Sequence, residues 1–399
     1  MTRRALCLAF ACLASSAGAQ TLPSEPVTLG GGRVVLGGDA AVSIAPEDEG
    51  FFNYSDYEHS TLREVRFGVT ASVRATDRLS FLGEVRSENF SHLAPFALYA
   101  RVRPFPGRRL DVQIGRIPPT FGTFTRRAYG RDNPLIGYPL AYQYLTSLRA
   151  DAVPASADEL VGMRARGWLT SFSVGNLAPD RGLPLVTAFS WDTGIQVTTG
   201  WRAVGVTASV TNGSASSPRV SDDNGGKQVA ARVTVEPLTG LILGSSFSRG
   251  QFLSRSVTQA IAAADAASFV QHAYGMDVEY SRDYWLLRGD AVLSQWQLPL
   301  AREPLTGGRL RALAVSLEGR YTLMPGVYAA VRAEHLAFSR IATSRQIVAW
   351  DAPVSRVEIG GGYYLQRNLV ARASWQHNTR ADGRVTRAHL LAGQLLFWF

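Results

Sequence analysis

The chain contains little cysteine, almost no lysine and no long apolar run beyond its first residues. Its two cysteines are Cys7 and Cys12, and all but one of its 41 basic residues are arginine. Beyond residue 19 there is therefore no thiol for a disulfide, a zinc cluster or a cysteine nucleophile. No later segment approaches the roughly 18 uninterrupted apolar residues that a membrane-spanning helix needs. These absences exclude a disulfide-stabilised fold and a helical membrane protein.

The first 19 residues have the three-part pattern of a cleaved signal peptide. Arg3 and Arg4 precede an apolar run, and small residues follow up to Ala19. We therefore expect residues 1–19 to be removed on export, and residues 20–32 to form a short periplasmic segment before a barrel of residues 33–399. The formal net charge of +9 favours anionic solutes or lipopolysaccharide phosphates over nucleic acid as partners of an exported protein.

Apolar and polar residues alternate with period two, in segments of about ten residues, through nearly all of the remaining chain. In residues 65–74 the apolar set begins Val65, Phe67, Val69, while Arg66 and Thr70 fall on the other face. Such a strand presents one face to lipid and one to water. The sequence predicts an all-β fold, a transmembrane antiparallel β-barrel of about sixteen strands, with about fourteen to eighteen allowed. A barrel of that size encloses a water-filled lumen.

Connections of two lengths separate these segments, as in barrels with short periplasmic turns and longer external loops. The short ones are 75–78, 104–109, 236–240, 281–283, 323–326 and 366–367. The longer ones are 45–60, 117–158, 212–226, 251–270, 298–308, 339–355 and 379–386. Aromatic residues beside the turns are predicted to lie at the lipid headgroup level. They are Trp201, Tyr284, Trp285, Tyr321, Tyr328, Tyr363 and Tyr364.

The last residues also alternate, and the chain stops on an aromatic residue within a strand pattern. Leu395, Phe397 and Phe399 share one face. A closed barrel needs its last strand to pair with its first, because an open edge would leave backbone groups unpaired in lipid. The pattern resembles the terminal strand of bacterial outer-membrane barrels. The resemblance implies that these three residues are the signal recognised by the barrel-assembly machinery.

The longest connection, 117–158, is the candidate constriction of the pore. It is rich in arginine and in aromatic residues, which favour a packed loop, and loops of this length are usually functional or disordered. We hypothesise that it folds into the lumen, where arginines create a field that favours anions. The candidate constriction residues are Arg126, Arg127, Arg131, Asp132 and Arg149. The alternative is an external loop whose arginines bind lipopolysaccharide or pair with Asp132 and Asp151.

The start of this connection resembles a known family. The run Gly115-Arg116-Ile117-Pro118-Pro119-Thr120-Phe121-Gly122 is similar to an element of the phosphate-selective porin O and P group and related general porins. Strands ending at Asn176 and at Asn212-Gly213 are also similar. The resemblance implies a sixteen-stranded, homotrimeric, diffusion-type pore. Lys227, the single lysine, cannot supply the lysine cluster of the phosphate channels, which argues against phosphate specificity.

Charged residues on the predicted inner face form the candidate lumen wall, in which opposite charges on neighbouring strands stabilise each other. The wall arginines are Arg66, Arg74, Arg101, Arg232, Arg288, Arg332 and Arg372. Their acidic partners are predicted to be Glu84, Glu88, Asp290, Glu318, Glu334 and Glu358. Because such pairing reduces the net field, the sequence predicts a weak anion preference.

The sequence predicts a porin for small anionic or neutral hydrophilic solutes, in the outer membrane of a Gram-negative-type cell, in contact with its lipid and lipopolysaccharide. The histidines lack metal-site spacing and the glycine runs lack a following helix, so we expect no enzyme, no metal and no cofactor. A hydrolase with a serine, histidine and acid on adjacent strands is the enzymatic alternative. A barrel with a closed lumen, such as an adhesin, an assembly partner or a hydrophobic-solute transporter, is the other.

Heat modification on a gel tests the predicted barrel. A barrel whose backbone is fully paired keeps its compact shape in detergent until it is heated. We therefore expect unboiled and boiled protein to migrate at different positions. Identical migration of both samples would contradict a closed barrel.

Overall fold

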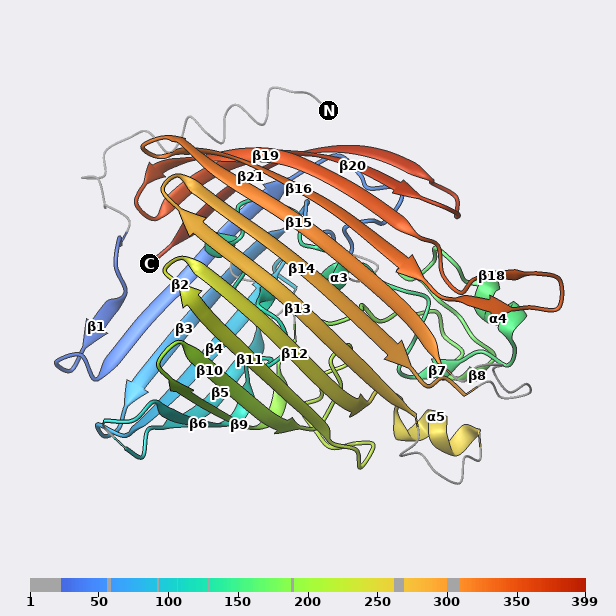
Figure 1. Cartoon of the computed structure of the whole chain (residues 1–399), viewed down its shortest axis with the longest axis horizontal. Helices are drawn as coiled ribbons and strands as arrows, with labels where there is room; N and C mark the ends of the chain where they lie inside the picture. The colour runs from blue at the N-terminus through green and yellow to red at the C-terminus, as the bar shows by residue number, and fades with distance from the viewer. Residues whose placement is uncertain are drawn as a thin grey trace.

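A closed β-barrel of sixteen antiparallel strands dominates the structure, a computed structural model (Figure 1). The structure describes residues 23–55, 59–91, 93–105, 107–127, 130–187, 190–261, 269–299 and 309–399. The predicted signal peptide, residues 1–19, lies outside the described residues. Among the helices that the structure describes, none combines the length and the apolar character of a membrane span. The predicted fold class and strand number are confirmed.

The barrel strands follow one another around the wall in chain order. In the first half they are β2 (Val34–Ile44), β3 (Val65–Arg74), β4 (Leu79–Glu88), β5 (Ala94–Val102), β6 (Leu110–Ile117), β9 (Asp192–Trp201), β10 (Val204–Thr211) and β11 (Gln228–Leu238). In the second half they are β12 (Leu241–Gln251), β13 (Val270–Arg282), β14 (Trp285–Trp296), β15 (Leu310–Met324), β16 (Val327–Phe338), β19 (Val354–Gln366), β20 (Leu369–Arg380) and β21 (Arg387–Trp398). The ring closes because β21 pairs with β2 as well as with β20.

The closing seam includes the predicted terminal strand. Ala41 lies opposite Leu396, and Val42 lies opposite Leu395. One step further, the amide of Phe399 donates to the carbonyl oxygen of Gly38 at 3.0 Å, and Gly38 donates back at 3.1 Å. On the same edge of β2, beyond the residues that pair with β21, the short strand β1 (Val27–Leu29) adds a hairpin. Residues 27–32 of the predicted periplasmic segment thus form part of that hairpin.

The two ends of the barrel differ. At one end, here called the turn end, the connections are short, and several have only two residues, such as 239–240 and 325–326. Gly240 and Gly326 take φ values of +84° and +82° there, which suits tight hairpin turns. At the other end, here called the loop end, the connections are long. Small elements lie in them: α2 (Phe124–Arg127), η1 (Gly130–Asp132), α3 (Leu140–Gln143), β7 (Ala152–Val153), α4 (Ala157–Gly162), β8 (Val174–Gly175), α5 (Arg255–Ala260), β17 (Arg340–Ala342) and β18 (Ile347–Ala349).

The longest connection is longer than the predicted 117–158, because β9 begins only at Asp192. Residues 118–191, here called the inward loop, contain all the small elements from α2 to β8. Gly167 and Gly182 show why residues near 167 form no wall hairpin. A Cβ atom at these positions would lie 1.8 Å from the carbonyl oxygen of Leu145 and 1.6 Å from that of Thr146. These residues pack against the loop's own backbone instead, and the strand predicted to end at Asn176 is only the two-residue β8.

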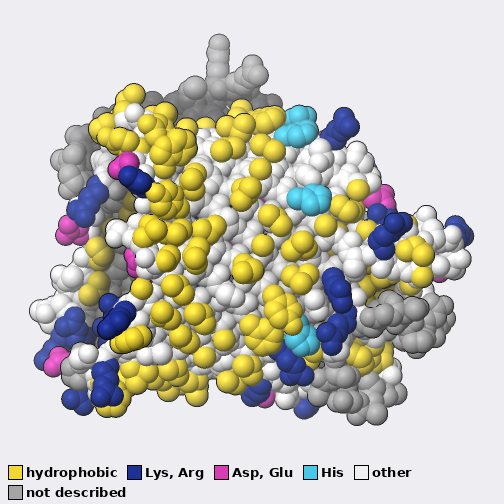
Figure 2. Space-filling model, viewed as in Figure 1, with side chains coloured by type: hydrophobic (Ala, Val, Ile, Leu, Met, Phe, Trp, Pro, Cys, Tyr) yellow, Lys and Arg dark blue, Asp and Glu magenta, His cyan; other side chains and the backbone are white. Residues whose placement is uncertain are grey.

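The outer face of the wall is apolar and the inner face is polar. On β16, Val331 is 46 % exposed while Arg332 is fully buried. The same alternation runs around the barrel, and Figure 2 shows a broad hydrophobic surface crossing the outer face between the two ends. Strand parity therefore turns the arginines and glutamates of the wall inward, as the alternation predicted.

Most of the turn-side aromatic residues lie on the outer face, but two do not. Trp201, Tyr284, Trp285 and Tyr363 are exposed near the turn end, where amphipathic rings suit a headgroup layer. For Tyr328, the predicted position at the headgroup level was wrong. Its side chain points inward, is 3 % exposed and donates to the carbonyl oxygen of Pro134 at 3.0 Å. Tyr364 packs beside it at 6.1 Å between ring centres. Proximity to a turn does not decide the face, whereas parity along the strand does.

The apolar outer face generates a prediction about depth. Leu317, near the middle of β15, is 64 % exposed, and Leu323, near the turn end of the same strand, is 56 % exposed. Because both face outward, we expect Leu317→Arg to cost about 2–4 kcal/mol of unfolding free energy in vesicles, and Leu323→Arg about 0–1 kcal/mol. Urea unfolding in lipid measures both. Equal costs at the two positions would show that this face does not cross a bilayer.

Candidate pore and inward loop

The inward loop packs against the inner face of the barrel wall. It leaves the wall at Gly122, whose φ of +71° lets the chain turn directly after β6 and whose amide donates to the hydroxyl of Ser246 at 3.0 Å. Further along, the amide of Gly137 donates to Glu358 at 2.9 Å, and that of Leu140 donates to Glu334 at 2.8 Å. Both glutamates are buried, so this part of the loop covers the wall strands β16 and β19.

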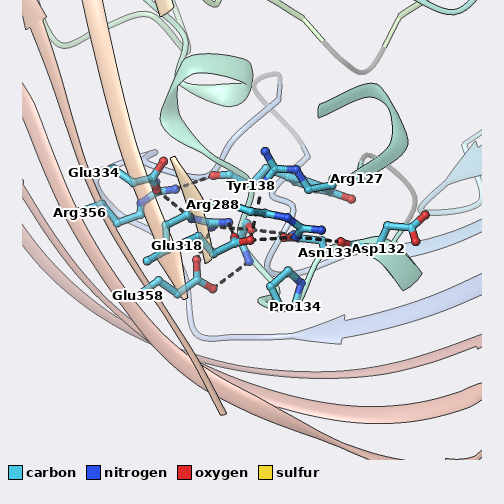
Figure 3. A network of polar contacts seen from close by, with 12 residues as sticks. Arg127, Asp132, Asn133, Pro134, Tyr138, Arg288, Glu318, Glu334, Arg356 and Glu358 are labelled. Carbon is cyan, nitrogen blue, oxygen red and sulfur yellow. Dashed lines mark hydrogen bonds and ion pairs between the residues drawn. The ribbon is translucent and has the colours of Figure 1, made fainter. Parts of the chain in front are cut away.

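A cluster of buried charges joins the loop to the wall (Figure 3). The guanidinium of Arg332 lies 3.2 Å from Glu318, 3.2 Å from Glu334 and 2.7 Å from Glu358. It also donates to the carbonyl oxygen of Gly137 at 2.6 Å. Because these groups have left water, removing one partner would strand the others at a cost of about 3–5 kcal/mol. The cluster therefore fixes the loop in one position.

Toward the loop end, the space between the inward loop and the wall is filled by apolar side chains. Phe124 stacks on Tyr142 with ring centres 4.7 Å apart, and Trp350 meets Trp296 edge-on at 5.9 Å. All four rings are at most 1 % exposed. This part of the barrel is consequently dry and closely packed.

The carboxylate of Asp351 stabilises the packing at the loop end. Asp351 is fully buried and accepts hydrogen bonds from the amides of Ser147 and Ala165, each at 2.8 Å. Burial raises the pKa of the Asp351 carboxyl above its ordinary value, and the backbone hydrogen bonds partly offset that rise. This side chain thus links the connection between β16 and β19 to the inward loop.

Toward the turn end the lumen stays open as a cavity of about 1640 Å³. We call it the vestibule. Residues 118–123 of the inward loop bound it on one side, and β5, β6 and β9 to β13 bound it on the other. Ten arginines and six acidic residues line it, which gives the vestibule an excess of positive charge.

A separate small cavity of about 30 Å³ adjoins Thr120, and Phe121, Ser209 and Thr211 are among the residues that line it. The hydroxyl of Thr120 lies 2.7 Å from that of Ser209 and accepts from the amide nitrogen of Gln196 at 2.7 Å. A volume of this size holds about one water molecule. Residues 118–120 line both cavities and therefore lie between the vestibule and this smaller space.

The predicted constriction residues occupy three different settings. Arg131 and Asp132 line the vestibule and form an ion pair at 3.4 Å. Arg127 also lines it, but lies 3.5 Å from Glu318. The side chain of Arg126 lies outside the described residues. Arg149 is fully buried and lies away from the vestibule lining.

Arg149 instead binds the inward loop to itself. It pairs with Asp151 at 2.8 Å and donates to the carbonyl oxygens of Thr170 and Ala178 at 2.9 Å and 2.7 Å. The structure thus contains both ion pairs of the alternative interpretation, Arg131 with Asp132 and Arg149 with Asp151. In this position Arg149 contributes to the loop's internal structure and does not line the vestibule.

Several of the predicted wall residues are covered by the inward loop. Arg332 and Glu334 belong to the buried cluster. Arg66 donates to the hydroxyl of Tyr138 at 2.6 Å, and Arg372 donates to the carbonyl oxygen of Gly130 at 2.7 Å. Arg101 lines the vestibule and pairs with Asp111. Alternation identified the inner face, but a sequence does not show which part of that face a loop covers.

Sequence reasoning missed the arginines at the turn end. Arg78, Arg108, Arg109 and Arg202 line the vestibule. The first three sit in connections that were predicted only as turns, and the connection 202–203 was not among the predicted turns. The signal that could have found them is their repetition, because several neighbouring turns carry a basic residue at the same end of the barrel. Within the described residues, no group of three or more histidine, cysteine or acidic side chains is arranged to hold a metal ion.

Solved structures similar to this one are outer-membrane proteins. OmpT of Vibrio cholerae superposes with a TM-score of 0.55 at 12 % identity, covering 94 % of this chain and 100 % of that one. An anion-selective porin from Comamonas acidovorans gives 0.54 at 10 % identity, covering 92 % and 99 %. OmpF of Salmonella typhi gives 0.54 at 10 % identity, covering 92 % and 97 %. At such low identity these likenesses establish the fold.

Comparisons based on the sequence alone found no similar protein. No family model matches the chain, and no curated protein matches it. A function for this barrel is therefore argued from its own residues.

The position of the inward loop generates a prediction that uses the scarcity of cysteine. In a chain without Cys7 and Cys12, the pair Thr120→Cys and Ser209→Cys brings two thiols to positions whose hydroxyls are 2.7 Å apart. We expect this pair to form a disulfide on mild oxidation, since its geometry requires such proximity. Mass spectrometry of the folded protein detects the bond. Thr120→Cys with Ser245→Cys, which lies on the exposed face of β12, is the matched control, and equal cross-linking of both pairs would contradict the described loop position.

Proposed function

We propose that this protein is a diffusion channel of the outer membrane, a porin, for small hydrophilic solutes with a weak preference for anions. The observation that carries the proposal is the vestibule, a cavity of about 1640 Å³ inside a closed barrel, in which ten arginines face six acidic residues. The likeness to porins with solved structures supports it. So does the similarity of residues 115–122 to the porin element described above.

The proposed origin of the anion preference is the turn end. At the inward loop, Arg127 and Arg131 each have a carboxylate within 4 Å, so their charges are largely balanced. By contrast, within the described part of the chain no ion pair joins Arg108, Arg109 or Arg202 to a carboxylate. Exposed charges are screened over about 10 Å at ordinary salt. The resulting selectivity is therefore weak.

The proposed constriction is the narrow passage at residues 118–121, with Arg127, Arg131 and Asp132 on its vestibule side. A narrow space lined by prolines, hydroxyl groups and Asp192, next to a basic vestibule, separates two tasks. Size exclusion falls to Thr120, Phe121 and Ser209, and charge discrimination falls to the vestibule.

The proposed setting follows from the two faces of the wall. The apolar outer face requires lipid, and an outer membrane supplies it together with lipopolysaccharide. We assign the turn end to the periplasm, because short turns lie there in outer-membrane barrels. Leu395, Phe397 and Phe399 in the closing strand are the proposed contact for the assembly machinery, and a homotrimer is the proposed assembly.

Ion selectivity in planar bilayers tests the proposal. We expect open channel steps whose reversal potential in a KCl gradient shows chloride preferred over potassium. Replacing Arg108, Arg109 and Arg202 together with glutamine removes positive charge from the vestibule, so the chloride preference should fall by about half or more. Replacing Arg345, Arg384 and Arg387 with glutamine makes the same charge change among exposed residues outside the vestibule and should leave the reversal potential unchanged.

Two outcomes would contradict the proposal in different ways. Silence from protein that is heat-modifiable, and so well folded, would support the closed-lumen alternative. Conductance with an unchanged reversal potential in the vestibule variant would retain the channel and remove the proposed origin of its selectivity.

A further inference from the structure

A second cavity opens from the inner wall at the turn end, with a volume of about 410 Å³. We call it the basic recess. It lies between β2, β3, β4 and β5, and it shares Asp77, Arg78, Arg101 and Arg103 with the lining of the vestibule. Its volume corresponds to roughly a dozen water molecules at about 30 Å³ each. Small solutes in the vestibule therefore have access to it.

Five arginines line this small space: Arg33, Arg74, Arg78, Arg101 and Arg103. Asp77 is the single acidic residue among the residues that line it. Arg101 and Arg103 both approach the same carboxylate, Asp111, the second at 3.3 Å. Two guanidinium groups thus share one negative charge.

The remaining three arginines have no such compensation. Within the part of the chain that the structure describes, no ion pair and no hydrogen bond engages the guanidinium of Arg33, Arg74 or Arg78. Like charges gathered in one cavity repel each other, and an anion is the natural means of relieving that repulsion. The recess therefore carries a larger local excess of charge than the paired surroundings of Arg127 or Arg332.

Backbone hydrogen bonds hold these arginines side by side. The amide of Arg74 donates to the carbonyl oxygen of Arg33 at 2.7 Å, and that of Arg103 donates to the carbonyl oxygen of Arg78 at 2.8 Å. Gly32 takes a φ of +83° in the turn just before Arg33, which lets the β1–β2 hairpin fold back and bring Arg33 to the recess. The clustering is thus built into the wall and does not depend on flexible side chains meeting by chance.

From this geometry we propose that the basic recess binds a multivalent oxyanion, one that carries phosphate groups or several carboxylates. Planar guanidinium groups donate paired hydrogen bonds that match the oxygens of such groups. Because several arginines converge on one ligand, a ligand with several negative charges should bind more tightly than chloride. The proposal deepens the proposed function and rests on it for the entry of solutes. A bound anion at the turn end would also slow the passage of others.

Calorimetric titration of the full-length, folded protein in neutral detergent at about 0.1 M salt tests this proposal. The probes are pyrophosphate and citrate, and the tighter of the two identifies phosphate or carboxylate as the preferred group. We expect binding to one site, weakened at least about tenfold by the triple substitution Arg33→Gln, Arg74→Gln and Arg78→Gln.

The matched control is Arg108→Gln, Arg109→Gln and Arg202→Gln, which removes the same charge from the vestibule outside the recess. Since screening limits its reach to about 10 Å, we expect it to weaken binding less than about threefold. Equal losses in both triple variants would show a diffuse field and overturn the recess as a site. Absence of binding to the unmodified protein would overturn it as well. Retained heat-modifiability of both variants establishes that they are folded.

Bilayer recordings of the same proteins separate this proposal from the channel proposal. Binding that depends on the recess, in a protein that does not conduct, retains the recess and refutes the channel. Conductance in a protein that binds neither probe retains the channel and refutes the recess.

Discussion

Closure of the backbone hydrogen-bond ladder between β21 and β2 is the constraint on which the rest of the structure depends. In lipid, an unpaired strand edge would leave a row of amides and carbonyls without partners, at several kcal/mol for each group. Once the ring is closed, every wall residue has a fixed side, because the pleat alternates. The apolar outer face, the inward arginines and the enclosed space all follow from that single geometric fact.

The inward loop divides the enclosed space into two parts with different physics. Toward the loop end, aromatic rings and buried ion pairs fill the space, and the buried charges described above are met by opposite charges or by backbone hydrogen bonds. Toward the turn end, water enters and charges are only partly matched. The wall is chemically similar throughout, so it is the loop that determines which wall arginines stabilise the fold and which remain available to solutes.

The barrel wall could be predicted from the sequence, whereas the packing of the inward loop inside the lumen could not. Period-two alternation identified the strands, their faces and even the inward arginines, because burial on one face acts on every second residue. Tyr328 was predicted on the wrong face, because the prediction used its proximity to a turn and not its position in the strand alternation. Arg149 and the true length of the inward loop were beyond it, since both depend on contacts between residues far apart in the chain. The turn-end arginines were overlooked because turn residues are usually interpreted by their backbone conformation.

The near-exclusive use of arginine has a consequence for the permanence of the lumen's charge. An amine moved from water into a crowded basic cavity readily gives up its proton, whereas a guanidinium keeps its proton in such surroundings. The arginines that line the vestibule and the basic recess therefore stay positively charged at any pH at which the protein is folded. Acid or alkali outside the cell can alter the partners of these arginines, but the cationic wall itself remains.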